Sequence, residues 1–158
     1  MKESVSLEFP AHHKFLSVLG AAVAAFADLT GDANLAYSVQ LAIHEVCANT
    51  IDHAYVAPHP DNRVVVHLTA NDRALHAEII DRGQTFDPQS FSWPLATTWE
   101  KAGSGSQPVY HLRRVAEPDL DQERGRGMFM ICQLMDEVTF TPQPNQNVWR
   151  LTRRYTPA

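Results

Sequence analysis

The chain has 158 residues, a net charge of -5 and 44% hydrophobic residues. This length suits one domain of ordinary size, and the composition is that of a globular protein rather than a disordered one. The excess of acidic residues argues against a domain whose main task is to hold a nucleic-acid backbone. No apolar stretch approaches the length of a membrane span, and the first residues lack the apolar region of a signal peptide. We therefore expect one cytoplasmic domain over residues 1–158, with no direct contact to nucleic acid or membrane.

The first half of the chain predicts a strand, two helices and a hairpin. Apolar and polar residues alternate over residues 5–9, which is the period of a strand. Apolar residues then recur at helical spacing over 12–28 and again over 33–54. Two further apolar runs, 64–70 and 75–81, are separated by a turn of hairpin length, so we predict two antiparallel strands.

The second half predicts a long loop, a helix and two strands. Periodicity is lost over about 88–123, a segment with four prolines and two tryptophans. Loops of this length are usually lids, binding loops or disordered segments, and otherwise they indicate a missed element. We predict a long lid or loop here, with a short helix near 112–116 as one option. A helix over 127–135 and strands over 138–141 and 148–155 complete the chain.

The order of these elements predicts the fold class. Consecutive strands joined by short turns do not fit a doubly wound parallel sheet. We predict an α+β two-layer sandwich, in which three helices cover one face of a mixed, mainly antiparallel sheet. Cys47 and Cys132 lie in predicted helices, and we expect neither a disulfide nor a zinc site.

The first group of candidate functional residues lies on the second predicted helix. Glu45 and Asn49 are followed one turn later by Asp52 and His53. Spacings of four, then three or four residues, place them on one face. A carboxylate can orient or deprotonate a hydroxyl group, and an amide oxygen is a suitable Mg²⁺ ligand. A solvated polar face is the more common explanation for such a stripe taken alone.

The second group follows a predicted strand. Asp81 stands at the end of that strand, where its carboxylate can accept a hydrogen bond from an exocyclic amine such as that of adenine. Gly83 comes two residues later and would let a ring approach the backbone. A plain turn explains the same residues equally well.

The third group opens the helix near residue 127. Gly125, Arg126 and Gly127 precede Met128 there, and free backbone N–H groups at a helix start, with an arginine nearby, make a phosphate site. A glycine hinge is the ordinary alternative. The order of the three groups strengthens each of them, because together they would complete a nucleotide site from separate elements.

Together the three groups resemble the GHKL ATPase superfamily, and specifically the small anti-sigma-factor serine kinases of bacterial partner switching. Residues 45–55 resemble the N box of that family, with Glu45, Asn49 and the His-Ala-Tyr run in register. Residues 81–88 resemble its first glycine box and residues 125–130 its second. The resemblance covers nearly the whole chain and implies a Bergerat-type fold that binds ATP and Mg²⁺.

The resemblance also implies roles for individual residues. Glu45 would be the general base for an acceptor serine, and Asn49 would hold Mg²⁺. Asp81 would bond the adenine amine, and Gly83 would let the adenine lie close. The residues implied to surround the phosphates are Gly125, Arg126, Gly127 and Met128, with His53 in support.

The function implied is that of an ATP-dependent serine kinase that binds a sigma factor and is countered by an antagonist protein, with a homodimer compatible with the resemblance. The alternative is a nucleotide-gated binding switch without phosphate transfer. The catalytic domain of a sensor histidine kinase is a weaker third hypothesis, because no phosphoacceptor helix precedes the first predicted helix. The loop at 88–123 departs from the family in its tryptophans and prolines; Trp93, Trp99 and Tyr110 either pack on the domain or present a partner contact.

Overall fold

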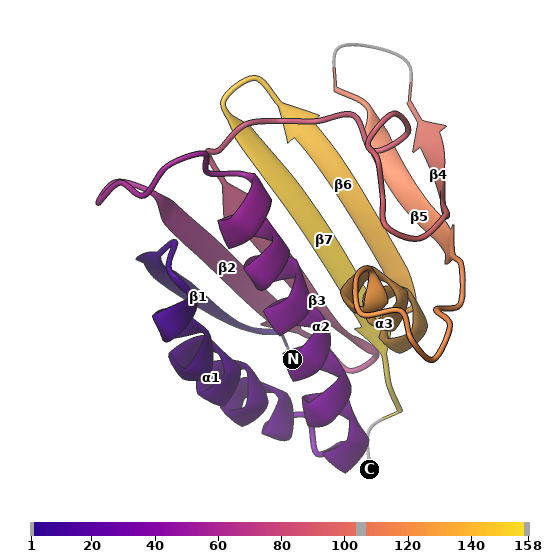
Figure 1. Cartoon of the computed structure of the whole chain (residues 1–158). Coiled ribbons are helices and arrows are strands. Elements are labelled where there is room, and N and C mark those ends of the chain that lie inside the picture. The colour runs from indigo at the N-terminus through magenta and orange to yellow at the C-terminus, as the bar shows by residue number, and fades with distance from the viewer. Residues whose placement is uncertain (1, 104–106, 157–158) are drawn as a thin grey trace.

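Seven strands form one sheet in the computed structural model, which describes residues 2–103 and 107–156 (Figure 1). Their order across the sheet is β1-β2-β3-β7-β6-β5-β4, and every pairing is antiparallel, so the described strands include no parallel pair of the kind a mixed sheet would contain. The strands are β1 (Glu3–Pro10), β2 (Arg63–Ala70), β3 (Ala74–Asp81), β4 (Thr97–Ala102), β5 (Val109–Val115), β6 (Glu137–Gln143) and β7 (Gln146–Arg154).

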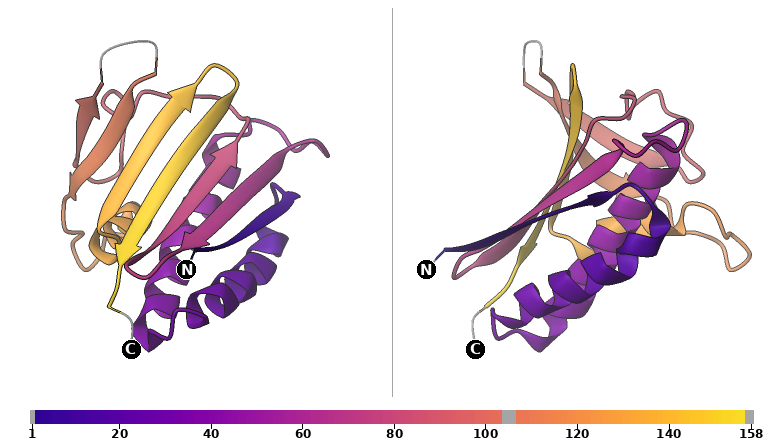
Figure 2. Two further views of the ribbon diagram at one scale, coloured as in Figure 1. Left: turned by 180° about the vertical axis from the view of Figure 1, so that it is seen from behind. Right: turned by 90° about the vertical axis from the view of Figure 1, so that its left-hand side faces the viewer.

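The helices lie on one face of this sheet, as Figure 2 shows from the side. They are a short 3-10 helix η1 (His13–Phe15), then α1 (Leu16–Asp28), α2 (Ala33–His53) and α3 (Arg126–Leu134). Asp32 is the N-cap of α2, and its carboxylate accepts hydrogen bonds from the amides of Asn34 and Leu35 at 2.9 and 3.3 Å. The predicted α+β two-layer sandwich with three α-helices on one face is confirmed. In the described ranges no helix is both long and apolar enough to cross a membrane.

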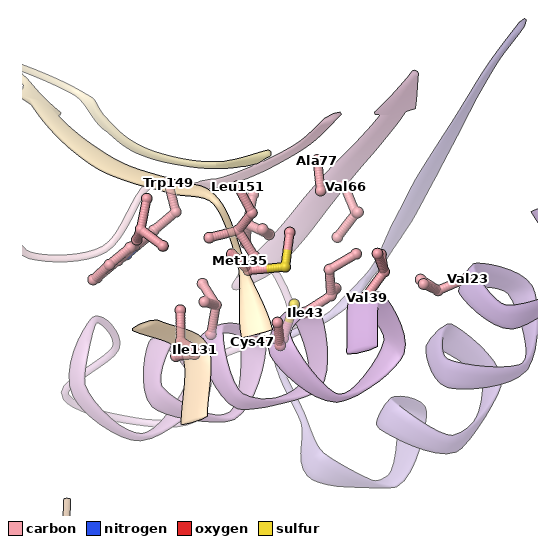
Figure 3. Close-up of a cluster of buried hydrophobic side chains, with 14 of the residues drawn as sticks. Val23, Val39, Ile43, Cys47, Val66, Ala77, Ile131, Met135, Trp149 and Leu151 are labelled. Atoms are coloured by element: carbon pink, nitrogen blue, oxygen red, sulfur yellow. The ribbon is translucent and has the colours of Figure 1, made fainter. Parts of the chain in front are cut away.

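The core lies between the sheet and the helices (Figure 3). Side chains alternate along a strand, so one face of β2 and β3 points at the helices and carries residues such as Val66 and Ala77, both fully buried. Ile43 and Cys47 of α2 pack against that face and are equally buried. Both cysteines of the chain are free, with Cys47 buried and Cys132 half-buried.

The segment 88–123 is not one long loop, so this part of the prediction is wrong. It contains β4 and β5, and the short helix expected near 112–116 falls within β5. The strands were hidden because β4 has a register shift between Thr98 and Trp99, which breaks the alternation of apolar and polar residues. The Gly-Ser-Gly run at 103–105 belongs to this segment, and residues 104–106 lie outside the described residues. Loops remain on both sides of the two strands.

Trp93, Trp99 and Tyr110 of this segment pack on the domain rather than forming an exposed partner contact. Trp99 and Tyr110 are buried, with 7% and 5% of their surface exposed. Trp93 stacks on Trp99 with ring centroids 5.8 Å apart, and Trp99 meets Trp149 of β7 at 5.9 Å. These contacts fix the loop before β4 to the sheet, close to the end of α2.

Candidate functional site

A cavity of about 370 Å³ opens where the last turns of α2, the loop after β3 and the start of α3 meet. Its volume is in the range of small-molecule sites. The lining residues are Glu45, Asn49 and His53; Gln84, Phe86, Phe91, Ser92, Trp93 and Pro94; and Glu123, Arg124, Gly125, Gly127 and Met128. Residues of the first and third groups line this cavity. The second group contributes through Gln84 and Phe86, which follow Asp81 and Gly83 in the chain.

The polar stripe of α2 forms one wall of the cavity, with Glu45 and Asn49 half-buried and His53 exposed. Glu45, Asn49 and His53 all line the cavity, while the core-facing residues of the same turns include Val46 and Thr50. The His53 ring lies 6.5 Å from the ring of Phe91, measured between centroids. Asp52, which the sequence placed beside this stripe, is exposed and hydrogen-bonds His13 at 2.6 Å.

The start of α3 offers backbone donors to an anion. Gly125 has φ of 87°, a left-handed conformation that favours glycine, and no side chain in the described chain caps the helix. The amides of the first turn have no partner inside the helix, and that turn contains no acidic residue. Because Gly125, Gly127 and Met128 line the cavity, these donors lie at its edge.

The two arginines beside this helix start have different surroundings. Arg126 donates from Nη2 to the carbonyls of Asp119 and Leu120, at 2.9 and 3.0 Å, and from Nε to the carbonyl of Gln122. Its guanidinium holds the preceding loop and does not line the cavity, contrary to its expected place at the phosphates. Arg124 does line the cavity, and among the described residues its guanidinium has no ion pair or hydrogen bond. Sequence reasoning missed Arg124 because it precedes the Gly-Arg-Gly motif.

Asp81 lies beneath the cavity wall rather than on it. Only 3% of its surface is exposed, and its Oδ1 accepts hydrogen bonds from the Gly83 amide at 2.9 Å and from Asn147 Nδ2 at 3.0 Å. Burial raises the pKa of Asp81 above its ordinary value, and these two donors oppose that rise. Asp81 is absent from the lining of this cavity and lines a second pocket beside Tyr55 and Arg82. Asn147 Nδ2 links it to the carbonyl of Gln84, a residue that does line the cavity.

Gly83 is required by packing in this structure. A Cβ there would overlap the carbonyl of Ala54 and lie 2.7 Å from the Ala54 Cβ, and the neighbouring Gln84 amide donates to that carbonyl at 2.7 Å. Tyr55 ties the same helix end to the sheet: its hydroxyl donates to the Arg63 carbonyl at 2.6 Å. The contact with Ala54 thus explains why glycine is needed at this position, without the expected approach of adenine.

Gly127 meets a different neighbour. A Cβ at this position would overlap Oε2 of Glu45, so the Glu45 carboxylate lies directly against the start of α3. The general-base candidate is therefore in contact with the start of α3, although 82 positions separate Glu45 from Gly127 in the chain.

The two glycines predict opposite results on substitution. Gly83→Ala forces backbone apart, and we expect it to lower the free energy of unfolding by about 1–3 kcal/mol. Gly127→Ala meets only the movable end of Glu45, so stability should change by less than about 1 kcal/mol, in part because alanine favours a helix. Thermal melting of both variants is the measurement. Equal destabilisation by the two would contradict this assignment.

The fold and the cavity define a nucleotide-binding ATPase type of domain. Residues 9–153 match the family model of the histidine kinase-like ATPase domain, and the chain belongs to this family. It is 30% identical over 139 residues to serine-protein kinase RsbW of Halalkalibacterium halodurans, and this match covers 86% of this chain and 74% of the relative. It is also 28% identical over 142 residues to serine-protein kinase RsbW of Bacillus cereus, covering 86% and 76% of the two chains. The resemblance drawn from the three motifs is confirmed.

Proposed function

We propose that the chain is an ATP-dependent protein serine kinase of bacterial partner switching. It acts as an anti-sigma factor that binds a sigma factor and phosphorylates an antagonist protein. The observation that carries the proposal is that Glu45 and Asn49 share one cavity with the start of α3 and with Arg124. Among the described residues, no side chain caps that helix start and none pairs with the Arg124 guanidinium. The relatives named serine-protein kinases support the reaction, and the antagonist, the sigma factor and a homodimer come from the resemblance to their family.

The residues present fit ATP and Mg²⁺. The α3 amides and Arg124 supply donors and a positive charge for the phosphates, and Asn49 supplies the neutral oxygen that Mg²⁺ accepts. Asp81 would accept the hydrogen bond of the adenine amine once the wall at Gln84 moves. Bound Mg²⁺ would neutralise charge on the phosphates, which is its usual part in phosphoryl transfer.

Glu45 would serve the acceptor serine. Its carboxylate accepts the proton of the serine hydroxyl as the bond from the serine oxygen to the γ-phosphorus forms and the bond to the β-phosphate oxygen breaks, leaving ADP. Such transfer depends mainly on positioning and charge stabilisation, and both the α3 amides and Arg124 lie where they can supply the latter. His53, at the far end of the stripe, would support the same phosphates.

Calorimetric titration with Mg-ATP tests the nucleotide site. We expect micromolar binding by the wild type and affinity at least about tenfold weaker in both variants, because Asn49→Ala removes the proposed Mg²⁺ ligand and Asp81→Asn removes the carboxylate proposed to accept from the adenine amine. Asp52→Asn is the matched control, since Asp52 lies on the same helix but off the cavity wall. No binding of ATP or ADP by the wild type would overturn the proposal.

A further inference from the structure

Asn147 is a buried amide on β7 that sequence analysis did not single out. It stands opposite Asp81 in the antiparallel register of β3 and β7, and 2% of its surface is exposed. Its Nδ2 donates to Asp81 Oδ1 at 3.0 Å and to the Gln84 carbonyl at 3.1 Å, with the Gly83 carbonyl at 3.5 Å. Three acceptors around one atom identify it as the nitrogen, so the orientation of the amide is determined.

The contacts of Asn147 leave Asp81 with one available oxygen. Oδ1 of Asp81 accepts from both Asn147 and the Gly83 amide, whereas Oδ2 has no hydrogen-bond partner among the described residues. The same Asn147 amide holds the Gln84 carbonyl, and Gln84 lines the cavity. Asn147 thus joins the carboxylate to the piece of wall that separates it from the cavity.

Asn147 has an unfavourable feature that a purely structural residue would avoid. Its Oδ1 is buried and has no hydrogen-bond partner in the described part of the chain. A buried unpaired carbonyl oxygen destabilises the folded protein, and leucine, which has nearly the same shape, would remove it. What leucine would lose is the donor to Asp81.

We propose that Asn147 is a positioning residue for Asp81: it keeps Asp81 a hydrogen-bond acceptor and leaves only Oδ2 available to a ligand. The site therefore selects a purine with an amine at C6 over a purine with an oxygen at C6. This inference rests on the proposed nucleotide-binding function. An amine at C6 donates to Oδ2, whereas an oxygen would face a carboxylate oxygen with no hydrogen between them.

The protonation of Asp81 decides this selectivity. Burial favours the protonated acid, and the hydrogen bond from Asn147 favours the carboxylate. A protonated Asp81 carries an O–H that can donate to an oxygen at C6, so selectivity falls when the acid form is populated. The titratable and charged groups around Asp81 are Tyr55 after α2, Arg82 next to it in the chain, His53 at the cavity, and Glu8, Asp61, Arg63 and His67 on the outer side of the sheet.

Two substitutions of nearly equal shape test the proposal. Asn147→Leu removes the donor, and Asn147→Asp replaces it with a second carboxyl that shares a proton with Asp81 at low pH. Affinities for Mg-ATP and Mg-ITP, which has an oxygen at C6, are measured by calorimetry from pH 5.5 to 8, together with thermal melting. For each variant the ATP-to-ITP preference is divided by that of the wild type at the same pH, which removes pH effects that the variants share with the wild type.

We expect the wild type to prefer ATP by about tenfold or more. In Asn147→Leu this preference should fall to below about threefold and decrease further as the pH falls, because Asp81 then takes up a proton. In Asn147→Asp the preference should instead increase as the pH falls, because one shared proton restores a donor to Asp81. The two variants should therefore differ in the sign of their pH dependence.

A wild-type preference in both variants, with changes only in melting temperature, would show that Asn147 is merely structural and would overturn the inference. Parallel pH dependences in the two variants would overturn it as well, and if only one variant folds, the sign of its own pH dependence decides. Failure of the wild type to bind ATP at all would instead overturn the proposed function, so the two failures are distinguishable.

Discussion

Glu45→Gln is expected to remove phosphate transfer while leaving nucleotide binding nearly unchanged. Glutamine has the shape of glutamate but cannot accept the proton of a serine hydroxyl, and loss of a general base lowers the rate by about 10²–10⁴-fold. Glu45 sits against Gly127 at the edge of the cavity, so the change should disturb neither the core nor the donors of α3. The measurement is single-turnover transfer of the γ-phosphate of ATP to an antagonist protein that the chain binds, beside calorimetry with Mg-ATP.

Asp52→Asn on the same helix removes one carboxylate outside the cavity and should transfer phosphate at the wild-type rate. If Glu45→Gln also transferred at that rate, Glu45 would not be the base. A wild type that binds both ATP and the antagonist yet never phosphorylates it would favour the alternative of a nucleotide-gated switch. In that case Glu45→Gln should leave partner binding intact.

The elements that sequence analysis located best are those with one periodic buried face. The α2 helix was predicted over 33–54 and runs from Ala33 to His53, because its apolar residues recur over five turns and Asp32 supplies a cap. The hairpin of β2 and β3 was located equally well, since a short turn joins two strongly apolar runs. The stripe of Glu45 and Asn49 was recognised because its polar residues follow the helical repeat.

The sequence signal failed where contacts distant in the chain determine the outcome. The β4 strand is an edge strand with mostly exposed residues and a register shift, so its pattern alone resembles a loop. Arg124 lines the cavity in place of Arg126 because carbonyls of the preceding loop engage Arg126, which no spacing rule reveals. Asn147 is found only through the pairing of β3 with β7, because 66 residues separate it from Asp81.

Arg124→Ala is expected to lower phosphate transfer by about 10²–10³-fold, which is the range for loss of a charged group that stabilises a phosphoryl transition state. Arg124 lines the cavity and has no carboxylate partner in the described ranges, so its charge is available to a phosphate. Nucleotide affinity should fall less than the rate, because the charge on the transferred group changes most in the transition state. Arg124→Lys keeps the charge but lacks the planar fork of donors, and should recover part of the rate.

Arg126→Ala is the matched control, since it removes the same charge two residues away. Its guanidinium is already engaged with the carbonyls of Asp119, Leu120 and Gln122, so we expect this variant to loosen the loop and to change transfer by less than about tenfold. Faster proteolysis of the loop before α3 would report that loosening, because a loop that loses its hydrogen bonds opens more often. If Arg126→Ala abolished transfer and Arg124→Ala did not, the phosphate-binding arginine would be Arg126, as the motif alone had predicted. The loop before α3 would then have to release Arg126 when nucleotide binds.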